Sequence, residues 1–548
     1  MSHPSRVRRP SVLFAVCLAL AVLASAPASA RGLEIDDVAR IVSVTDAAVS
    51  PDGAHVAYVR NVPRDPYDDD DGPAWTELHV ATAKGASRPF VTGEVNVSSI
   101  DWTPDGAAIT YLAKRHGDEH GAVWSIPVDG GESRKLAGFE TSISTYAISP
   151  DGARIAFVAT AKAPEAEEKR ADKGFKAKVV EEGLRPQQLW IATLKPTGAV
   201  DTDDATAVPL EGSVSRIAWS PDGERLSVAV APTPLIDDEY MKRKVQVVDV
   251  AGKVLARIDN TGKLGAVRWS PDGSKLALIS AADLHDPNAS RLMVAPATGG
   301  ALKPLLPADF EGDVEQIAWK DADTIVYVVD QGTGAAVAEI GADGQGGAVL
   351  SASGGPIFNS LSLSDDGGVA ALVADAPDHP EELFVLSGGR LERWTDSNPW
   401  LADIELAPQE TIVWKARDDR DIEGVLIRPL GETAGVRYPL IHVVHGGPEA
   451  HYSNGWMTAY SRPGQVAAAQ GYFVLHANYR GSTGRGVAFS KLDQADYAGD
   501  PSGEQAGEFW DLVDGVEHLV SEGLVDRAKV GVTGGSYGGF ASAWCATA

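Results

Sequence analysis

The sequence predicts a seven-bladed β-propeller followed by a smaller α/β unit. Three observations predict this fold class. A Pro-Asp-Gly type turn recurs with a period of about fifty residues over the first four hundred residues. After Trp400 that period is lost, and apolar strands alternate with helices instead. Near the end, a glycine-rich segment around Ser536 connects the last predicted strand to a helix.

The recurring turn has five regular copies and two degenerate ones. The regular copies are Ser50-Pro51-Asp52-Gly53, Thr103-Pro104-Asp105-Gly106, Ser149-Pro150-Asp151-Gly152, Ser220-Pro221-Asp222-Gly223 and Ser270-Pro271-Asp272-Gly273, and the degenerate ones are Lys320-Asp321-Ala322-Asp323 and Ser364-Asp365-Asp366-Gly367. Each copy lies between an alternating strand and an apolar strand, which predicts a β-hairpin. One such unit cannot bury both of its faces, so seven of them predict a ring of seven blades.

The residues that mark each repeat are expected to be structural. Four of the strands end in a tryptophan, at Trp102, Trp219, Trp269 and Trp319. We expect these rings to pack between neighbouring blades rather than to bind a ligand. The turn aspartates are expected to bond to their own backbone rather than to a metal. The gap between the third and fourth copies is longer and holds the charged residues 165–170, which predict an exposed helix or loop on the third blade.

The second unit begins near residue 406 and reads as an α/β sheet. A hairpin is expected over residues 411–428, and buried strands over 440–444, 472–475 and 530–533. A short helix is expected between Pro463 and Gly471, with Pro463 in its first turn. Ser502 and Gln505 form a predicted capping box for a longer amphipathic helix that ends at Gly523.

The first thirty residues have the pattern of a cleavable secretory signal. Arginines at positions 6, 8 and 9 precede an apolar run over residues 12–23 and then Ala28-Ser29-Ala30. The run is too short to span a bilayer, so no stable membrane insertion is expected after cleavage. Lipidation at Cys17 and an uncleaved anchor are less favoured alternatives. We therefore predict a periplasmic or secreted protein.

The amino-acid composition limits the kinds of partner and cross-link that are expected for this protein. The formal net charge is −28, which disfavours nucleic acid and anionic membranes. Of the two cysteines, only Cys545 lies outside the predicted signal, so no internal disulfide is expected. No cofactor and no metal site is expected.

The segment Gly534-Gly535-Ser536-Tyr537-Gly538 carries the predicted chemistry. A serine at a sharp strand-to-helix turn between glycines is typical of the nucleophile elbow of α/β-hydrolases. The alternative is a purely structural glycine turn. An oxyanion hole would draw on the helix N-terminus and on a loop after an earlier strand, where Gly446 and Gly447 stand. We expect a supporting role for the adjacent His445, because the base of this architecture follows the serine in the chain.

Taken together, the repeated turns, His445-Gly446-Gly447-Pro448, Asn478-Tyr479-Arg480-Gly481-Ser482 and the Ser536 segment resemble the prolyl oligopeptidase family, particularly its dipeptidyl and acylaminoacyl peptidases. The resemblance implies residues 31–405 as a propeller that admits short peptides to an α/β-hydrolase domain over 406–548. It implies Ser536 as the nucleophile of an acyl-enzyme, with an oxyanion hole formed by the N–H groups of Tyr537 and of Gly446 or Gly447. Arg480 would contact substrate carbonyls or form a salt bridge at the domain interface.

One departure from the family pattern stands out. The family has an Asp and then a His after the serine, whereas twelve residues follow Ser536. The sequence therefore predicts an incomplete α/β-hydrolase domain that lacks the expected Asp and His, and an unassisted serine is a weak nucleophile. Two alternatives stay open, a non-catalytic propeller that binds partners in the cell envelope and a carboxylic ester hydrolase. Cleavage specificity and oligomeric state are not readable from the residues.

Overall fold

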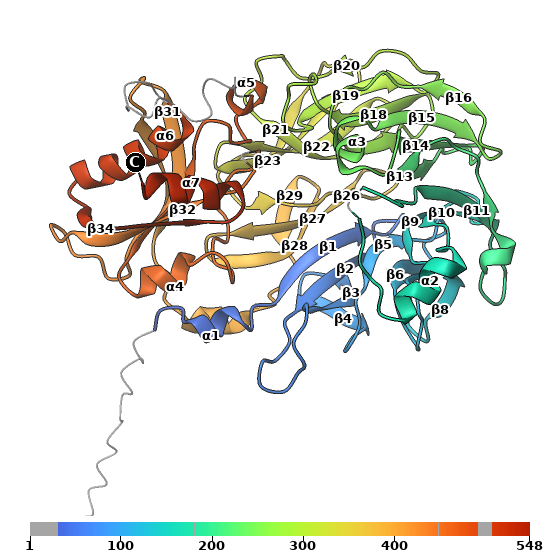
Figure 1. Ribbon diagram of the computed structural model, residues 1–548, viewed down its shortest axis with the longest axis horizontal. Coiled ribbons are helices and arrows are strands. Elements are labelled where there is room, and N and C mark those ends of the chain that lie inside the picture. The colour runs from blue at the N-terminus through green and yellow to red at the C-terminus, as the bar shows by residue number, and fades with distance from the viewer. Residues whose placement is uncertain (1–30, 180, 448, 492–506, 548) are drawn as a thin grey trace, which may run out of the picture.

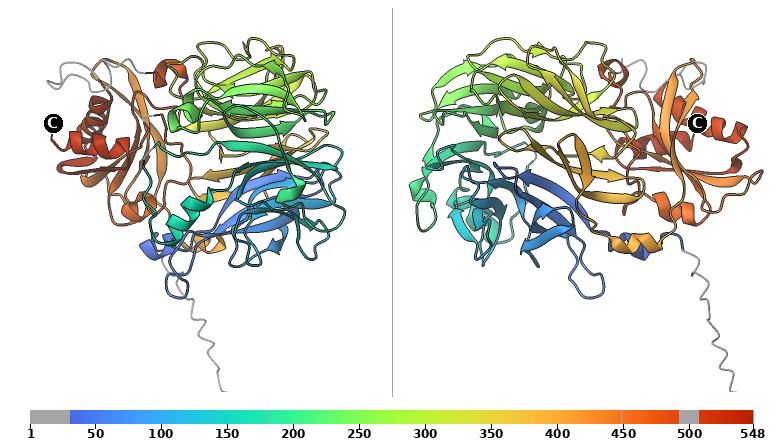
Figure 2. Two further views of the ribbon diagram at one scale, coloured as in Figure 1. Left: turned by 45° about the vertical axis from the view of Figure 1, so that its right-hand side comes forward. Right: turned by 180° about the vertical axis from the view of Figure 1, so that it is seen from behind.

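A computed structural model describes residues 31–179, 181–447, 449–491 and 507–547. It consists of a β-propeller and an α/β unit that lies to one side of the ring (Figures 1 and 2). Seven antiparallel sheets of consecutive strands form the blades, which confirms the predicted fold class. The predicted signal and the capping box of Ser502 and Gln505 lie outside the described residues.

The first three blades carry one helical projection. Their strands are β1 (Ser43–Val49), β2 (Val56–Val62), β3 (Trp75–Ala83) and β4 (Ala86–Val91); β5 (Ser98–Trp102), β6 (Ala108–Ala113), β7 (Ala122–Pro127) and β8 (Arg134–Ala137); and β9 (Ile143–Ile148), β10 (Arg154–Thr160), β11 (Gln187–Thr193) and β12 (Thr206–Ala207), preceded by the 3-10 turn η1 (Thr202–Asp204). Between β10 and β11 lies α2 (Glu165–Asp172), which buries no residue. Of the exposed helix or loop predicted for the long gap, the structure shows the helix.

The last four blades follow the same plan. Their strands are β13 (Ser213–Trp219), β14 (Arg225–Ala231), β15 (Lys244–Asp249) and β16 (Val254–Arg257); β17 (Leu264–Trp269), β18 (Lys275–Ser280), β19 (Arg291–Pro296) and β20 (Lys303–Pro304); β21 (Asp313–Trp319), β22 (Thr324–Gln331), β23 (Gly334–Gly341) and β24 (Ala348–Ser351); and β25 (Ile357–Phe358), β26 (Ser362–Leu363), β27 (Val369–Ala376), β28 (His379–Ser387) and β29 (Arg390–Arg393). A short helix, α3 (Ile236–Met241), connects β14 to β15.

The ring closes by packing between the first and last blades, because each sheet is made only of its own consecutive strands. Val44, Tyr58, Leu383 and Val385 share one apolar cluster across this junction. The amide of Val49 also donates to Ser362 Oγ at 3.1 Å. Side-chain burial between blades therefore holds the ring together.

The recurring turns form as their residues predict. In the fifth copy, Ser270 Oγ donates to Asp272 Oδ1 at 2.6 Å, and the same oxygen accepts the amide of Ser274 at 3.0 Å. These bonds, led by the one from Ser270, hold the pKa of Asp272 at about 2. The turn aspartate therefore accepts a hydrogen bond from the backbone of its own turn, as expected.

The tryptophans join neighbouring blades. The indole N–H of Trp219 donates to the carbonyl of Ala147 on the previous blade, at 3.1 Å. Trp102 and Trp269 likewise donate to carbonyls of the blade before their own, those of Ala48 and Ala218, at 2.9 and 3.2 Å. The packing role predicted for these rings is confirmed, with a hydrogen bond added.

The α/β unit has one five-stranded sheet in the order β30-β31-β33-β32-β34. Its strands are β30 (Gln409–Lys415), β31 (Asp421–Ile427), β32 (Tyr438–Val444), β33 (Phe473–Asn478) and β34 (Val525–Gly534), and its helices are α4 (Gly464–Ala469), α5 (Val487–Ser490), α6 (Glu508–Ser521) and α7 (Tyr537–Cys545). The strand β32 is parallel to β33 and to β34, whereas β30 and β31 form the predicted antiparallel hairpin. Parallel strands end at a common edge, and that edge carries the candidate site.

A short N-terminal segment ties the two units together. The helix α1 (Ile35–Val38) precedes the first blade, and the turn η2 (Pro399–Asp403) follows the last one. Leu33 packs with Leu401, Trp456 and Val466 in one buried cluster. Residues before the propeller therefore contact the α/β unit. Among the described residues, no helix is both long and apolar enough to cross a lipid bilayer.

Candidate active site

Ser536 lies at the tip of the turn between β34 and α7. Its backbone has φ 55° and ψ −125°, in the region that residues other than glycine seldom adopt. Such strain persists only where the surrounding structure fixes it, and it occurs most often at functional sites. The side chain is exposed to solvent. The turn therefore presents the hydroxyl outward, in the manner of a nucleophile elbow.

The glycines around Ser536 are required by close backbone contacts. A Cβ on Gly538 would lie 2.1 Å from the carbonyl oxygen of Val444, and one on Gly534 would lie 2.4 Å from the same oxygen. Neither position can hold a side chain without moving the backbone. The glycines thus let α7 start directly against β32.

The predicted oxyanion loop lies beside the serine. Because β32 and β34 are parallel, with Val444 paired to Gly534, the residues that follow them emerge at the same edge of the sheet. A Cβ on Gly446 would lie 3.2 Å from Ser536 Cβ and 3.7 Å from its Oγ. The fold therefore brings together Gly446, Gly447, Ser536 and Tyr537, whose roles in catalysis stay predictions.

His445 is held by its own loop. Its Nδ1 lies 2.8 Å from the carbonyl oxygen of Gly446, and its Nε2 lies 2.8 Å from Ser482 Oγ. The ring stacks on Tyr479 at a centroid distance of 4.4 Å. Burial lowers the pKa of His445 to about 4, so the imidazole is neutral at pH 7. Both nitrogens are engaged away from Ser536, which fits a supporting role.

A buried carboxyl group anchors the residue next to the serine. The phenol of Tyr537 donates to Glu508 Oε1 at 2.7 Å, and the two rings of Tyr537 and Phe509 are stacked. Glu508 is fully buried, and burial raises its pKa to about 7. Sequence reasoning missed Glu508, because an acidic residue in the first turn of a helix ordinarily faces solvent.

Arg480 is engaged in ion pairs inside the α/β unit. Its Nε and Nη2 each lie 2.8 Å from the carboxylate of Asp511, and its two terminal nitrogens lie 3.0 Å from that of Asp418. The side chain is only 3 % exposed. The structure therefore favours the salt-bridge alternative, with the correction that both partners belong to the α/β unit and not to the propeller. These contacts leave the guanidinium no free face for a substrate carbonyl.

The propeller touches the loops that follow β32 and β33. The amide of Asn454 donates to the carbonyl of Thr333 on the sixth blade at 2.7 Å, and Lys263 pairs with Glu449 at 2.8 Å. The amide of Gly332 donates to the carbonyl of Gly484, also at 2.7 Å. The ring is thus fixed against the same sheet edge from which Ser536 emerges.

Within the described ranges, no group of three or more acidic, histidine or cysteine side chains is arranged to hold a metal.

Two family models match parts of this chain. Residues 458–548, which include the Ser536 turn, match the prolyl oligopeptidase family, and this match supports the assignment of the chain to that family. Residues 34–189 separately match a lipoprotein LpqB β-propeller domain.

Several known peptidases are similar to this chain. An uncharacterized peptidase, YuxL of Bacillus subtilis, is 28% identical over 93% of this chain and 79% of its own length. Dipeptidyl aminopeptidase BIII of Pseudoxanthomonas mexicana is 32% identical over 34% of this chain and 26% of its own length. The solved acylaminoacyl peptidase of Pyrococcus horikoshii has a TM-score of 0.71 at 18% identity, over 92% of this chain and 75% of its own. The recognition of the family from its motifs is therefore confirmed.

Proposed function

We propose that this protein hydrolyses short peptides through an acyl-enzyme formed on Ser536. The strained, outward-facing backbone of Ser536, set beside the Gly446 loop at one sheet edge, is the observation that carries the proposal. Membership of the prolyl oligopeptidase family supports peptide bonds as the target. The similarity to a dipeptidyl aminopeptidase and to an acylaminoacyl peptidase supports substrates of a few residues.

In the proposed reaction, Ser536 Oγ adds to the carbonyl carbon of the scissile bond. The resulting oxyanion accepts hydrogen bonds from the N–H of Tyr537 and from that of Gly446 or Gly447. The C–N bond then breaks, the amine leaves with the proton that the Ser536 hydroxyl has lost, and water hydrolyses the acyl ester to release the acid and restore the hydroxyl. His445 is a poor candidate for the base, because its two nitrogens already face Gly446 and Ser482.

The propeller is proposed to restrict access to this serine. Contacts from the sixth blade and from Lys263, which precedes the fifth blade, reach the loops after β32 and β33, close to the predicted oxyanion loop. A substrate must therefore pass the ring or the seam between the units, which favours short or unfolded chains.

The first thirty residues support export from the cytoplasm. Detection of a processed protein that begins at Arg31 in the periplasmic or secreted fraction would test this proposed export.

The experiment compares Ser536→Ala with Ser542→Ala. Ser542 is a matched control because it lies on the same helix, where its hydroxyl bonds to the carbonyl of Gly538 at 2.7 Å. We expect a fluorophosphonate to label the wild-type protein and Ser542→Ala, but not Ser536→Ala. We also expect hydrolysis of aminoacyl and dipeptidyl anilides to fall by at least a factor of about 10³ only in Ser536→Ala.

Three outcomes would contradict the proposal. Labelling or hydrolysis that survives in Ser536→Ala would exclude this nucleophile. Hydrolysis of p-nitrophenyl esters without hydrolysis of any peptide would favour an ester hydrolase. A wild-type protein that neither reacts with the fluorophosphonate nor cleaves substrates would favour a non-catalytic propeller.

A further inference from the structure

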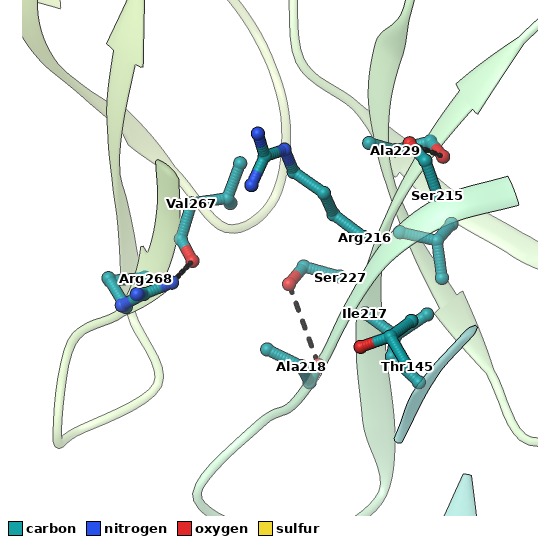
Figure 3. Close-up of a pocket in the computed structure, with 10 residues that line it drawn as sticks. Thr145, Ser215, Arg216, Ile217, Ala218, Ser227, Ala229, Val267 and Arg268 are labelled. Atoms are coloured by element: carbon teal, nitrogen blue, oxygen red, sulfur yellow. Dashed lines mark hydrogen bonds between the residues drawn. The ribbon is translucent and has the colours of Figure 1, made fainter. Parts of the chain in front are cut away.

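Two arginines face a small cavity inside the propeller ring. Arg216 lies on β13 and Arg268 on β17, which are the first strands of the fourth and fifth blades and contact each other. Thr145, Ser215, Ser227 and Val267 are among the residues that line the rest of this cavity, whose volume is about 200 Å³. Figure 3 shows the guanidinium of Arg216 extended into the open space, with Arg268 on the far side of Val267.

These two guanidinium groups lack an opposite charge in contact. Among the described residues, neither side chain has a carboxylate within 4.0 Å, and the one hydrogen bond of Arg268 goes to the carbonyl of Val267 at 3.1 Å. Both side chains are exposed to the solvent of the ring interior, but desolvation by the surrounding blades lowers the pKa of both arginines, and the nearby charges of Arg243 and Arg268 lower that of Arg216 further. Like charges held together in a partly desolvated space favour the binding of an anion.

The acidic groups that face the ring interior lie on other blades. Asp101 on β5 attracts Arg268 electrostatically, but its carboxylate accepts the amide of Trp102 at 2.8 Å. Asp46 on β1 likewise accepts the amide of Ala47 at 2.9 Å. Glu315 on β21 is exposed to the ring interior, and desolvation by the surrounding blades and the nearby charge of Asp313 raise its pKa to about 7. Asp101 therefore offsets part of the charge of Arg268 from a distance, but no carboxylate of the described residues is in ion-pair contact with Arg216 or Arg268.

The size and chemistry of the cavity indicate the ligand. A planar guanidinium binds a carboxylate through two parallel hydrogen bonds, and two such groups that line one cavity both favour a carboxylate there. A volume of about 200 Å³ is below that of sites for drug-sized ligands, so it accommodates the end of a chain rather than a whole peptide. We propose that Arg216 and Arg268 form a carboxylate-binding site inside the ring, which takes the C-terminal carboxylate of a short peptide.

The test measures binding rather than cleavage, so its result is independent of the role proposed for Ser536. Calorimetric titration of the Ser536→Ala protein at low ionic strength compares acetyl-Gly-Gly, which has a free carboxylate, with its C-terminal amide. The acetyl group removes the amine, so attraction of an ammonium group by the acidic side of the ring does not enter the comparison. We expect the carboxylate form to bind about tenfold more tightly and to weaken as salt is added.

Variants assign that preference to the two side chains. We expect Arg216→Gln combined with Arg268→Gln to remove the difference between carboxylate and amide. Arg257→Gln is the matched control, because Arg257 is exposed on β16, the outer strand of the same blade as Arg216. Arg216→Gln alone relieves like-charge repulsion, so it is expected to fold with a Tm no lower than that of the parent and to lose most of the preference.

The proposal is overturned if the parent protein binds carboxylate and amide equally. It is also overturned if the preference survives in the double glutamine variant, or disappears equally in Arg257→Gln. Inorganic phosphate that binds as tightly as acetyl-Gly-Gly would indicate a general anion site and would overturn the assignment to peptides.

Discussion

Replacing Arg480 with methionine tests whether this residue is part of the folded core of the α/β unit. Asp511 is fully buried, and its carboxylate accepts the amide, Nε and Nη2 of Arg480 at 2.8 to 2.9 Å. Methionine has a similar length but removes two of these three donors. The variant therefore leaves a buried carboxylate that is only partly satisfied.

The expected loss of stability follows from burial. Breaking a buried ion pair by removing one partner costs about 3–5 kcal/mol. The second pair adds little, because the side chain of Asp418 is 37 % exposed and exposed pairs contribute about 0–1 kcal/mol. Burial raises the pKa of Asp511 while Arg480 draws it back down. Protonation of Asp511 in the variant therefore makes the loss smaller at pH 5 than at pH 8.

Urea unfolding followed by tryptophan fluorescence measures this loss, because Trp414 packs against α6 and bonds to the carbonyl of Asp511. Arg420→Met is the control, because Arg420 is exposed in the turn between β30 and β31 that also holds Asp418. It should change the free energy of unfolding by less than about 0.5 kcal/mol. Adding Asp511→Leu to Arg480→Met should recover at least about 2 kcal/mol, since the unpaired charge is then gone. A loss below about 1 kcal/mol for Arg480→Met, or no recovery in the double variant, would refute the reasoning.

Three further changes test the turn, its anchor and the ring. Gly538→Ala should lower the free energy of unfolding by at least about 2 kcal/mol and abolish fluorophosphonate labelling, because the new Cβ would lie 2.1 Å from a carbonyl oxygen of β32. Gly535→Ala is the control and should retain its stability, because its Cβ would meet nothing within 4 Å. Equal losses of stability in the two variants would contradict this prediction. Glu508→Gln should raise the Tm above that of wild type at pH 8 but not at pH 4. The reason is that burial raises the pKa of Glu508 to about 7, so the wild-type protein loses stability as the pH rises from about 4.5 to 7. A difference in Tm that does not change with pH would count against this prediction. Trp219→Phe should lower the free energy of unfolding in urea by about 1 kcal/mol more than Trp190→Phe. Trp219 loses a hydrogen bond between blades, whereas the indole N–H of Trp190 has no partner among the described residues. The reverse order would exclude the bond between blades as the cause.

Local patterns were sufficient for most of the architecture. The Ser-Pro-Asp-Gly turns predicted every regular hairpin, because the serine and aspartate bond to backbone groups within five residues of themselves. The alternation of apolar strands and helices after Trp400 predicted the parallel pair β32 and β33 for the same reason. These signals depend on neighbours in the chain, so they are readable without the fold.

The contacts of individual side chains were less predictable. The sequence offered two roles for Arg480, and the partner Asp511 lies 31 residues away. Glu508 gave no signal at all, because its burial depends on Tyr537 and on how α6 meets α7. Long-range pairs of this kind depend on the packing of several elements, and no local rule encodes them.

The sequence by itself determined the propeller, the α/β unit and the glycine-bordered turn that holds Ser536, since turn chemistry and hydrophobic periodicity act over a few residues. Only the tertiary structure decided which charges meet. It paired Arg480 with Asp511, buried Glu508 beneath Tyr537, and brought Arg216 and Arg268 together inside the ring. The physical reason is that the energy of a charge depends on its burial and on its neighbours in space, and both are fixed only when the chain is packed.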